Sequence, residues 1–107
     1  MKVRVWTSPQ ADEQAIEAAT WWRVNRPASP GLFRAELARG LQLLAEAPDV
    51  GRRYRNPDIP GLRRLLLSDT RYHVYYVHEA DRGEVVVLAI WSAVRGRGPR
   101  LVRRNTI

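Results

Sequence analysis

The sequence predicts an α+β fold whose strands and helices follow one another in the order β-α-α-β-β-β. Residues 62–67, 72–77 and 84–91 are short apolar runs separated by turn residues, which is typical of a meander of three strands. Two stretches with helical periodicity precede them, joined by a short connector that contains proline. A brief alternating run opens the chain. We therefore expect a helical hairpin packed across one face of a small, mostly antiparallel sheet.

The first strand and the first helix are expected close to the N-terminus. Apolar residues alternate with polar or larger ones over residues 2–7, which predicts a strand. Ser8 is a good N-cap, and Pro9 suits the first helical position because no needed donor is lost there. The helix should end near Arg26, because the residue before Pro27 is disfavoured in the helical conformation. Its apolar face is formed by Ala11, Ala15, Ala18, Ala19 and Trp22.

The second helix is expected to begin at Ser29-Pro30, where the same cap-and-proline signal occurs, and to end before Pro48. The short connector implies that the two helices are antiparallel neighbours. Residues 49–61 are expected to form a loop. The apolar stripe of this helix should pack on the sheet together with Ala15 and Trp22, and it consists of Phe33, Leu37, Leu41 and Leu44.

The charge of the chain is strongly asymmetric. Residues 1–51 hold six basic and six acidic residues, whereas residues 52–107 hold twelve basic and five acidic ones, which accounts for the whole net charge of +7. Seventeen of the eighteen basic residues are arginines, and Lys2 is the exception. This asymmetry predicts a positive potential on one side of the fold, which favours nucleic acid or an acidic protein as partner.

The composition excludes several kinds of site. The chain has no cysteine, so disulfides and thiolate metal sites are excluded. Only His73 and His78 are available as imidazole ligands, and we expect neither a metal nor a cofactor. No apolar stretch is long enough to span a membrane, and the N-terminus lacks the apolar run of a signal peptide. We therefore expect a cytoplasmic protein without a membrane partner.

Aromatic side chains and one histidine are candidates for binding or chemistry. His73 has an unperturbed pKa near neutrality and suits general acid–base catalysis, although a lone histidine on a strand is more often structural. Tyr72 and Tyr76 share one face of their strand and Tyr75 lies on the other, so one set should be core and the other available for binding. Trp21 lies about 100° around the helix from its apolar face, which favours an exposed anchor for a protein partner.

Arginines gather in the C-terminal half of the chain. Arg63 and Arg64 are neighbours on one strand and should point to opposite faces of the sheet. For a single arginine the plain interpretation is a solvated rim, but a cluster of like charges destabilises a fold unless a partner offsets it. We expect Arg64, Arg95 and Arg97 to converge at one end of the sheet, because the strand of Arg64 begins near where the last strand could finish.

Five short segments stand in a fixed order along the chain: residues 5–12 (VWTSPQAD), 48–51 (PDVG), 61–64 (GLRR), 72–77 (YHVYYV) and 87–91 (VLAIW), the last followed by Arg95-Gly96-Arg97. In order and spacing these segments resemble the RelE/ParE toxins of bacterial type II toxin–antitoxin systems. The resemblance covers nearly the whole chain and implies a single toxin domain over residues 1–107.

The family divides into two activities, and the resemblance favours one of them. RelE-like members cleave mRNA in the ribosome with basic residues and usually a C-terminal tyrosine, whereas ParE-like members lack that set and inhibit DNA gyrase. Arg64 and Arg95 resemble two of the basic residues of the nuclease, but Leu66 and Ser68 stand where further basic groups are expected. Leu101 stands near the position of the tyrosine, and leucine cannot transfer a proton. The resemblance therefore implies a ParE-like toxin without enzymatic activity.

Two alternatives stay open at this point. A RelE-like mRNA endonuclease would act on the ribosome and mRNA, and its catalytic residues would be Arg64, His73 and Arg95. A plain nucleic-acid-binding module would use the basic C-terminal half and would bind naked nucleic acid in a strongly salt-dependent manner.

The ParE-like hypothesis assigns two sets of contact residues. Contacts with the target, DNA gyrase, are expected from Arg63, Arg64, Arg95, Arg97 and Arg100. Contacts with a cognate antitoxin are expected from Trp21, Arg71, Tyr75 and Trp91. We expect the antitoxin to contribute an acidic, amphipathic segment that folds on binding.

Overall fold

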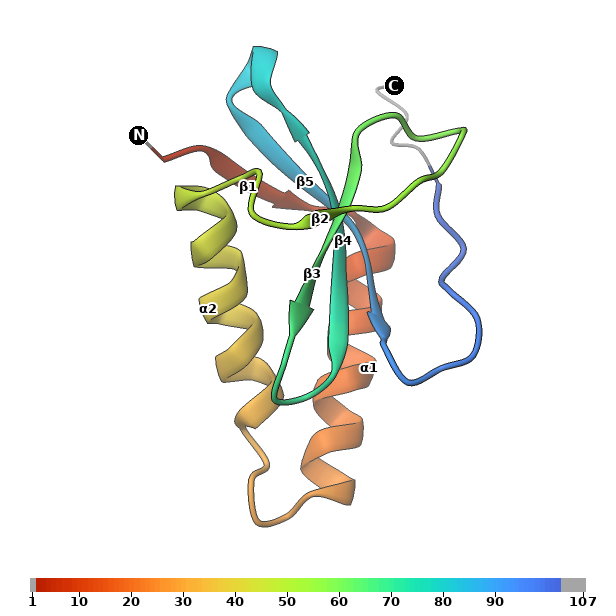
Figure 1. The fold of residues 1–107 in the computed structure, drawn as a ribbon. Coiled ribbons are helices and arrows are strands. Elements are labelled where there is room, and N and C mark those ends of the chain that lie inside the picture. The colour runs from red at the N-terminus through yellow and green to blue at the C-terminus, as the bar shows by residue number, and fades with distance from the viewer. Residues whose placement is uncertain (1, 103–107) are drawn as a thin grey trace.

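A computed structural model describes residues 2–102 as a five-stranded sheet with two helices packed on one face (Figure 1). The sheet has the strand order β1-β5-β4-β3-β2. Along the chain the elements are β1 (Arg4–Thr7), α1 (Pro9–Asn25), α2 (Leu32–Glu46), β2 (Arg52–Arg53), β3 (Leu62–Leu67), β4 (Tyr72–Glu79), a 3-10 turn (Ala80–Arg82) and β5 (Glu84–Ser92).

The pairing of the strands confirms the predicted fold class. β1 pairs in parallel with β5, and the other three pairings are antiparallel. β4 lies between β3 and β5, so that Tyr75 is paired with both Arg64 and Ala89. An irregularity between Tyr75 and Tyr76 shifts the register with β5, and a bulge of this kind increases the local twist.

The two helices begin in different ways. Ser8 caps α1 as predicted: its Oγ accepts a hydrogen bond from the N–H of Ala11 at 3.0 Å. The predicted start of α2 was wrong, because its N-cap is Gly31 and no side chain caps it. Ser29 instead closes a turn, in which its carbonyl accepts from the N–H of Leu32 at 3.2 Å. Both helix ends agree with the expected positions before Pro27 and Pro48.

A short strand interrupts the segment that was expected to be loop. Arg52 and Arg53 form β2 and pair with Arg64 and Arg63 at the edge of the sheet. The N–H of Tyr54 continues the pairing by donating to the carbonyl of Leu62 at 3.0 Å. Two residues are too few to produce a periodic signal, so only the pairing partner reveals this strand.

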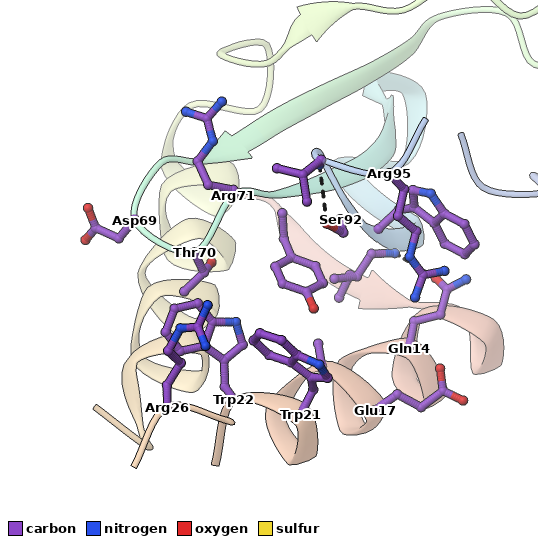
Figure 2. A pocket seen from close by; sticks show the side chains of 15 residues that line it. Gln14, Glu17, Trp21, Trp22, Arg26, Asp69, Thr70, Arg71, Ser92 and Arg95 are labelled. Carbon is purple, nitrogen blue, oxygen red and sulfur yellow. Dashed lines mark hydrogen bonds between the residues drawn. The ribbon is translucent and has the colours of Figure 1, made fainter. Parts of the chain in front are cut away.

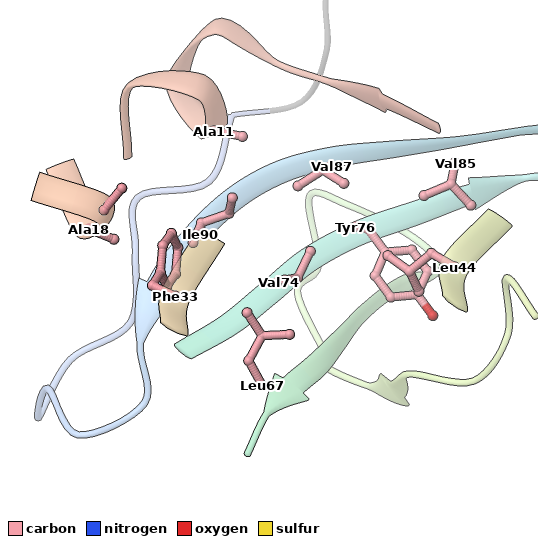
Figure 3. Close-up of a cluster of buried hydrophobic side chains, with 11 residues drawn as sticks. Ala11, Ala18, Phe33, Leu44, Leu67, Val74, Tyr76, Val85, Val87 and Ile90 are labelled. Carbon is pink, nitrogen blue, oxygen red and sulfur yellow. The ribbon is translucent and has the colours of Figure 1, made fainter. Parts of the chain in front are cut away.

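The face of the sheet that the helices cover, the helix face, holds the larger core (Figure 3). Phe33 and Leu44 of α2 are almost fully buried there, as predicted. Leu37 and Leu41, together with Ala15 and Trp22 of α1, are partly buried and pack against this core, which confirms the predicted stripe. The remaining buried members are Ala11, Ala18, Ala19, Leu67, Val74, Tyr76, Val85, Val87 and Ile90.

The opposite face, the helix-free face, holds a second core that the sequence did not predict. Its buried members are Ile59, Leu62, Tyr75, Val86, Leu88 and Ala89, and Tyr54, Val77, Trp91 and Leu101 pack against them. The expectation that only one tyrosine set would be core is therefore wrong: Tyr75 is 2% exposed on this face and Tyr76 is fully buried on the other. Both sets are buried because loop residues and the C-terminal segment cover the helix-free face.

Neither α1 nor α2 has the length and apolarity that a membrane span requires, and the described residues contain no other helix that does.

Candidate functional site

A pocket lies where the second half of α1 meets the β3–β4 turn and the end of β5 (Figure 2). Its volume is about 690 Å³. We call it the corner pocket, and its walls are formed by Gln14, Glu17, Ala18, Trp21, Trp22, Arg26, Asp69, Thr70, Arg71, Tyr72, Ile90, Trp91, Ser92, Val94 and Arg95. Gln14 holds α1 against the sheet here, because its Oε1 accepts the N–H of Ile90 at 2.8 Å.

Two tryptophans and an arginine form the helical wall of the corner pocket. Trp21 is 44% exposed, as the helical spacing predicted, and meets Trp22 edge to face with ring centroids 5.9 Å apart. The guanidinium of Arg26 lies 5.0 Å from the ring centre of Trp21 and 5.7 Å from that of Trp22, which gives cation–π contacts. Nε1 of Trp22 is buried and finds no acceptor within residues 2–102.

The β3–β4 turn forms the second wall and is held by a buried carboxylate. Glu36 of α2 accepts the N–H of Asp69 at 2.7 Å, the N–H of Thr70 at 2.9 Å and the hydroxyl of Thr70 at 2.7 Å. Burial raises the pKa of Glu36, but these hydrogen bonds and the charge of Arg39 outweigh it and hold the pKa below its usual value. The ionised carboxylate therefore fixes the turn.

Arg71 completes this turn in an unusual backbone conformation. Its φ of 65° lies in the left-handed region, which costs a residue with a side chain about 1–2 kcal/mol. Its N–H donates to the carbonyl of Leu67 at 2.8 Å, and its own carbonyl accepts the N–H of Ala93 at 2.7 Å. These bonds tie the turn to the end of β5, and the side chain of Arg71 points away from the corner pocket (Figure 2).

The third wall comes from the ends of β4 and β5. Tyr72 packs edge to face against Phe33 in the core with its ring centre 4.9 Å away. Burial raises the pKa of Tyr72, and the nearby charge of Arg95 opposes that effect, so the phenol is neutral at pH 7. The guanidinium of Arg95 lies 4.4 Å from the ring centre of Trp91. The corner pocket thus combines an aromatic lining with the guanidinium groups of Arg26 and Arg95.

A second cluster lies on the helix-free face. We call it the arginine–tyrosine face, and it consists of Tyr54, Arg64, His73 and Tyr75. The guanidinium of Arg64 lies 4.5 Å from the ring centre of Tyr54, and its Nη1 donates to the hydroxyl of Tyr75 at 3.4 Å. The ring of Tyr75 lies 5.3 Å from that of Tyr54 and 5.9 Å from that of His73. Arg64 is thus held by aromatic side chains.

His73 is neutral in this setting. Burial lowers the pKa of its imidazole, and the positive charges of Arg64 and Arg71 lower it further. A neutral imidazole beside a guanidinium suits proton abstraction, but the described part of the chain places no carboxylate at this cluster to orient the ring. From the C-terminal segment, Leu101 packs against the second core of this face, and it is apolar.

The C-terminal segment runs back along the sheet after β5. Nε1 of Trp91 donates to the carbonyl of Arg97 at 2.8 Å, and Nε2 of Gln10 donates to the carbonyl of Arg100 at 2.7 Å. A side chain added at Gly98 would begin 3.4 Å from the hydroxyl of Tyr54. Figure 1 shows this segment beside the loop that precedes β3. The side chains of Arg97 and Arg100 are exposed along it.

The predicted convergence of the arginines rested on an incorrect strand direction. β3 and β5 are both antiparallel to β4, so they run in the same direction, and the start of β3 lies level with the start of β5. Arg64 is level with Ala89 inside the sheet, whereas Arg95 follows the far end of β5 and lines the corner pocket. Only the returning C-terminal segment brings the backbone of residues 97–98 toward the arginine–tyrosine face.

Arg63 points away from Arg64, as the strand geometry predicted. Its Nη1 donates to the carbonyls of Asp49 at 3.0 Å and Gly51 at 2.7 Å, and its Nε lies 3.8 Å from the carboxylate of Asp49. The same carboxylate contacts Nδ1 of His78 at 2.8 Å, and this hydrogen bond is the main reason why the pKa of Asp49 is lowered. Arg63 is thus engaged within the fold and is set apart from the other arginines that were assigned to the target.

The corner pocket gathers three of the four residues that were assigned to the antitoxin: Trp21, Arg71 and Trp91. Tyr75 lies on the other face and is buried, which separates it from this group. Sequence reasoning missed Arg26, although its position four residues after Trp22 was a usable signal for stacking on a helix. It also missed Gln14, for which the sequence gives no signal. Within residues 2–102 no three His, Asp or Glu side chains gather as a metal site would require.

Together these features define a class: a small, basic α+β protein with two separate cationic and aromatic surfaces. Residues 5–96 match the sequence pattern of a family described as the ParE toxin of the type II toxin–antitoxin system parDE. The chain therefore belongs to the ParE toxin family of type II toxin–antitoxin systems. A search of curated protein sequences found no match.

Solved structures share the fold. A chain of the chromosomal ParDE system from P. aeruginosa is 15% identical and superposes with a TM-score of 0.67, over 85% of this chain and 96% of that one. A mutant of the E. coli toxin RelE in its free state is 16% identical with a TM-score of 0.58, over 88% and 86% of the two chains. A chain of the toxin–antitoxin complex RelBE2 from Mycobacterium tuberculosis is 16% identical with a TM-score of 0.62, over 86% and 99%.

Proposed function

We propose that this toxin acts in the cytoplasm as a non-enzymatic inhibitor of DNA gyrase and that a cognate antitoxin neutralises it. The observation that supports the non-enzymatic assignment is the composition of the arginine–tyrosine face. A guanidinium keeps its proton at any physiological pH, so Arg64 has no capacity to act as a base. Leu101, which packs against the second core of the same face, offers no proton either. The face therefore suits contacts with anions better than proton transfer.

The target-binding surface in this proposal consists of Arg64 on the arginine–tyrosine face and of the exposed arginines that follow β5. Arg64 is held in place by Tyr54 and Tyr75, which lowers the entropy that it loses on binding. Arg97 and Arg100 are exposed on the segment that returns past this face, and Arg95 precedes them. Arg63 acts indirectly in this picture, because its guanidinium holds residues 49–51.

The family to which this chain belongs supports an antitoxin partner. Solved structures that share the fold support it as well. The ParDE and RelBE2 structures are described as toxin–antitoxin systems or complexes. In this chain the corner pocket groups Trp21, Arg71 and Trp91, and aromatic residues and arginine are the types that dominate binding energy at protein interfaces. We assign antitoxin contacts to these three residues.

One observation favours a second candidate, a ribosome-dependent mRNA endonuclease. His73 is neutral and lies close enough to Arg64 for that charge to lower its pKa. A neutral histidine beside a phosphate-binding arginine is a plausible base for the attack of a 2′-hydroxyl. In that mechanism Arg64 would hold the phosphate and His73 would accept the proton, whereas Arg95 lies apart from them at the corner pocket.

Two assays with the purified protein test the proposal and separate the candidates. We expect the protein to inhibit gyrase supercoiling, and Arg64→Gln to require about tenfold more protein for equal inhibition, which is the effect of losing ~1.4 kcal/mol of binding. His73→Ala should inhibit as well as the parent, and Arg82→Gln, at the far end of the β4–β5 hairpin, serves as the matched control. Codon-specific mRNA cleavage on translating ribosomes that is lost in His73→Ala would replace this proposal with the nuclease.

A further inference from the structure

We propose that the open edge of β1 pairs with the same edge of a second copy of this chain, so that the two five-stranded sheets join into one continuous sheet. The two β1 strands would run antiparallel about a twofold axis perpendicular to the sheet. This surface is separate from the corner pocket and from the arginine–tyrosine face. The inference goes beyond the proposed function and does not depend on it.

The backbone of β1 directs hydrogen-bonding groups to its open side. β1 lies at one edge of the sheet, and among residues 2–102 only β5 pairs with it. The N–H groups of Arg4 and Ser8 donate to backbone carbonyls on the β5 side at 3.0 and 2.9 Å. Because these groups alternate in direction along a strand, the N–H and C=O groups of Val5 and Thr7 point to the open side. A further strand can pair with them there.

The two edges of the sheet differ in how they are protected. Proteins prevent edge strands from pairing with other chains by keeping them very short or by placing charged side chains on them. β2 has both features, because it consists of two arginines that pair with two arginines of β3. β1 has four residues, and Val5 and Trp6 stand at its centre. The edge at β1 is therefore the one that is open to pairing.

The charges around β1 favour a second copy as the occupant of this edge. Residues 1–51 carry equal numbers of basic and acidic side chains, whereas residues 52–107 carry the whole net charge of +7. Nη2 of Arg4 lies 3.3 Å from the carboxylate of Glu84, and Nζ of Lys2 lies 3.9 Å from that of Glu46. Two copies that meet through β1 therefore bring neutral surfaces together, while a strongly acidic partner finds no net attraction there.

Trp6 gives the pairing an aromatic centre. Val5 packs on the helix face, so Trp6 stands on the helix-free face, where it is 46% exposed. The guanidinium of Arg4 lies 5.6 Å from its ring centre, and Val86 of β5 is its neighbour on one side. On the other side no strand among the described residues adjoins it. Aromatic side chains directly opposite each other on paired strands stabilise a sheet, and a second Trp6 supplies that partner.

One register fits the groups that are free. When Trp6 lies opposite Trp6 of the second copy, Val5 lies opposite Thr7, and each such pair exchanges both of its N–H···O bonds. The alternative register sets Val5 opposite Val5 and brings Thr7 of the second copy against Val3. The N–H of Val3 already donates to the carbonyl of Ala45 at 2.9 Å, so that register would compete with an existing bond.

Sedimentation velocity of the full-length protein tests the proposal. We expect the mass to rise from monomer to dimer between about 1 and 100 µM, the range of a weak interface. Added salt should strengthen the dimer, because it screens the repulsion between two molecules of charge +7. Trp6→Lys should raise the dimer Kd by about tenfold or more, because it places a charge at the centre of the edge.

Trp21→Lys is the matched control. Trp21 is 44% exposed, nearly as much as Trp6, but it lies on α1, and its substitution adds the same charge. Trp21→Lys should change the dimer Kd by less than about twofold, within the scatter of near-neutral positions. Thermal melts show whether each variant is folded.

Because the chain has no cysteine, a single introduced thiol tests the register. Directly opposite residues that do not exchange hydrogen bonds have Cα atoms about 4.5 Å apart, a distance that a disulfide spans. Mild oxidation of Trp6→Cys should therefore give a covalent dimer on a non-reducing gel. Val24→Cys controls for random collision, because Val24 is 70% exposed on α1 and its thiol should remain mostly unlinked.

Four outcomes would overturn the inference. They are a protein that stays monomeric at about 200 µM, a dimer that weakens with added salt, equal weakening by Trp6→Lys and Trp21→Lys, and equal crosslinking of Trp6→Cys and Val24→Cys. If Trp6→Lys does not fold, Trp6→Cys supplies the test without an added charge. Gyrase inhibition by the parent has no bearing on these results, so the inference and the proposed function fail separately.

Discussion

The two faces of the sheet are covered in different ways. On the helix face, two long helices supply apolar side chains at regular spacing, and these pack on Val74, Tyr76 and Val87. On the helix-free face, single residues from irregular segments cover the strands, among them Ile59 and Leu101. The regular cover leaves little of the sheet accessible, whereas the irregular cover leaves Arg64 and His73 partly exposed. The difference suggests that stability depends mainly on the helix face and that the helix-free face is available for binding.

The largest effect is expected from a cavity on the helix face. Phe33 is 1% exposed and packs edge to face against Tyr72, so Phe33→Ala should lower the free energy of unfolding by about 3–5 kcal/mol. Leu43, on the same helix but 39% exposed, is the control, and Leu43→Ala should cost less than about 1 kcal/mol. Urea denaturation measures both. Equal losses would mean that the helix face does not dominate the stability of the fold.

The helix face was also the part of the fold that the sequence predicted best. The stripe of α2, from Phe33 to Leu44, runs over about three helical turns, and the spacing of its leucines and phenylalanine predicts one buried face. Strand β2 was not predicted, because its two residues form a strand only by pairing with the edge of β3. The start of α2 was misassigned because Ser29-Pro30 has the composition of a cap, while the observed turn places Gly31 at the cap position. Short elements depend on tertiary partners that periodicity does not reveal.

Gly51 lies in one of the segments that resemble the family, and its packing explains why a glycine stands there. The N–H of Gly51 donates to the hydroxyl of Tyr76 at 2.8 Å, deep in the fold. A Cβ at this position would lie 2.7 Å from the ring of Tyr76 and 2.9 Å from the carbonyl of Arg64. The resemblance located this residue in the sequence, but only the packing gives the reason for it.

The next effect concerns Glu36, which links α2 to the rim of the corner pocket. Glu36→Gln replaces a charged acceptor of three hydrogen bonds and sets an amide donor against backbone N–H groups, so we expect a loss of about 2–3 kcal/mol at pH 7. The control is Glu46→Gln at the end of the same helix, where the side chain is 50% exposed. It should cost less than about 0.5 kcal/mol.

The pH dependence of this loss is a further measurement on the same variant. Because the pKa of Glu36 is lower in the folded protein, its stabilisation is fully present above the unfolded value of about 4.3 and disappears as the pH falls through the folded value. The difference between parent and Glu36→Gln in urea melts should therefore narrow below about pH 4. A difference that stays constant down to pH 2 would show that the pKa of Glu36 is the same in the folded and the unfolded protein.

The candidate site was predicted less completely than the fold. The helical wheel predicted that Trp21 is exposed, and the assignment of Trp21, Arg71, Tyr75 and Trp91 to the antitoxin stays a prediction. Arg26 was missed because it follows the last residue of α1, where its direction depends on how the helix ends. The burial of Tyr75 was not predicted, because alternation along a strand separates the two faces but does not say that loops cover the second one.

The smallest effect is expected on the helix-free face. Leu101 is partly buried against the second core, and its loss removes part of one apolar contact, so Leu101→Ala should cost about 1 kcal/mol. The adjacent Val102 is 60% exposed and gives a matched control, since Val102→Ala should leave the urea midpoint unchanged. Because Leu101 transfers no proton in the proposed function, Leu101→Ala should also inhibit gyrase nearly as well as the parent. A loss as large as that of Phe33→Ala would contradict the comparison of the two faces, because the C-terminal segment would then be as important to folding as the helices.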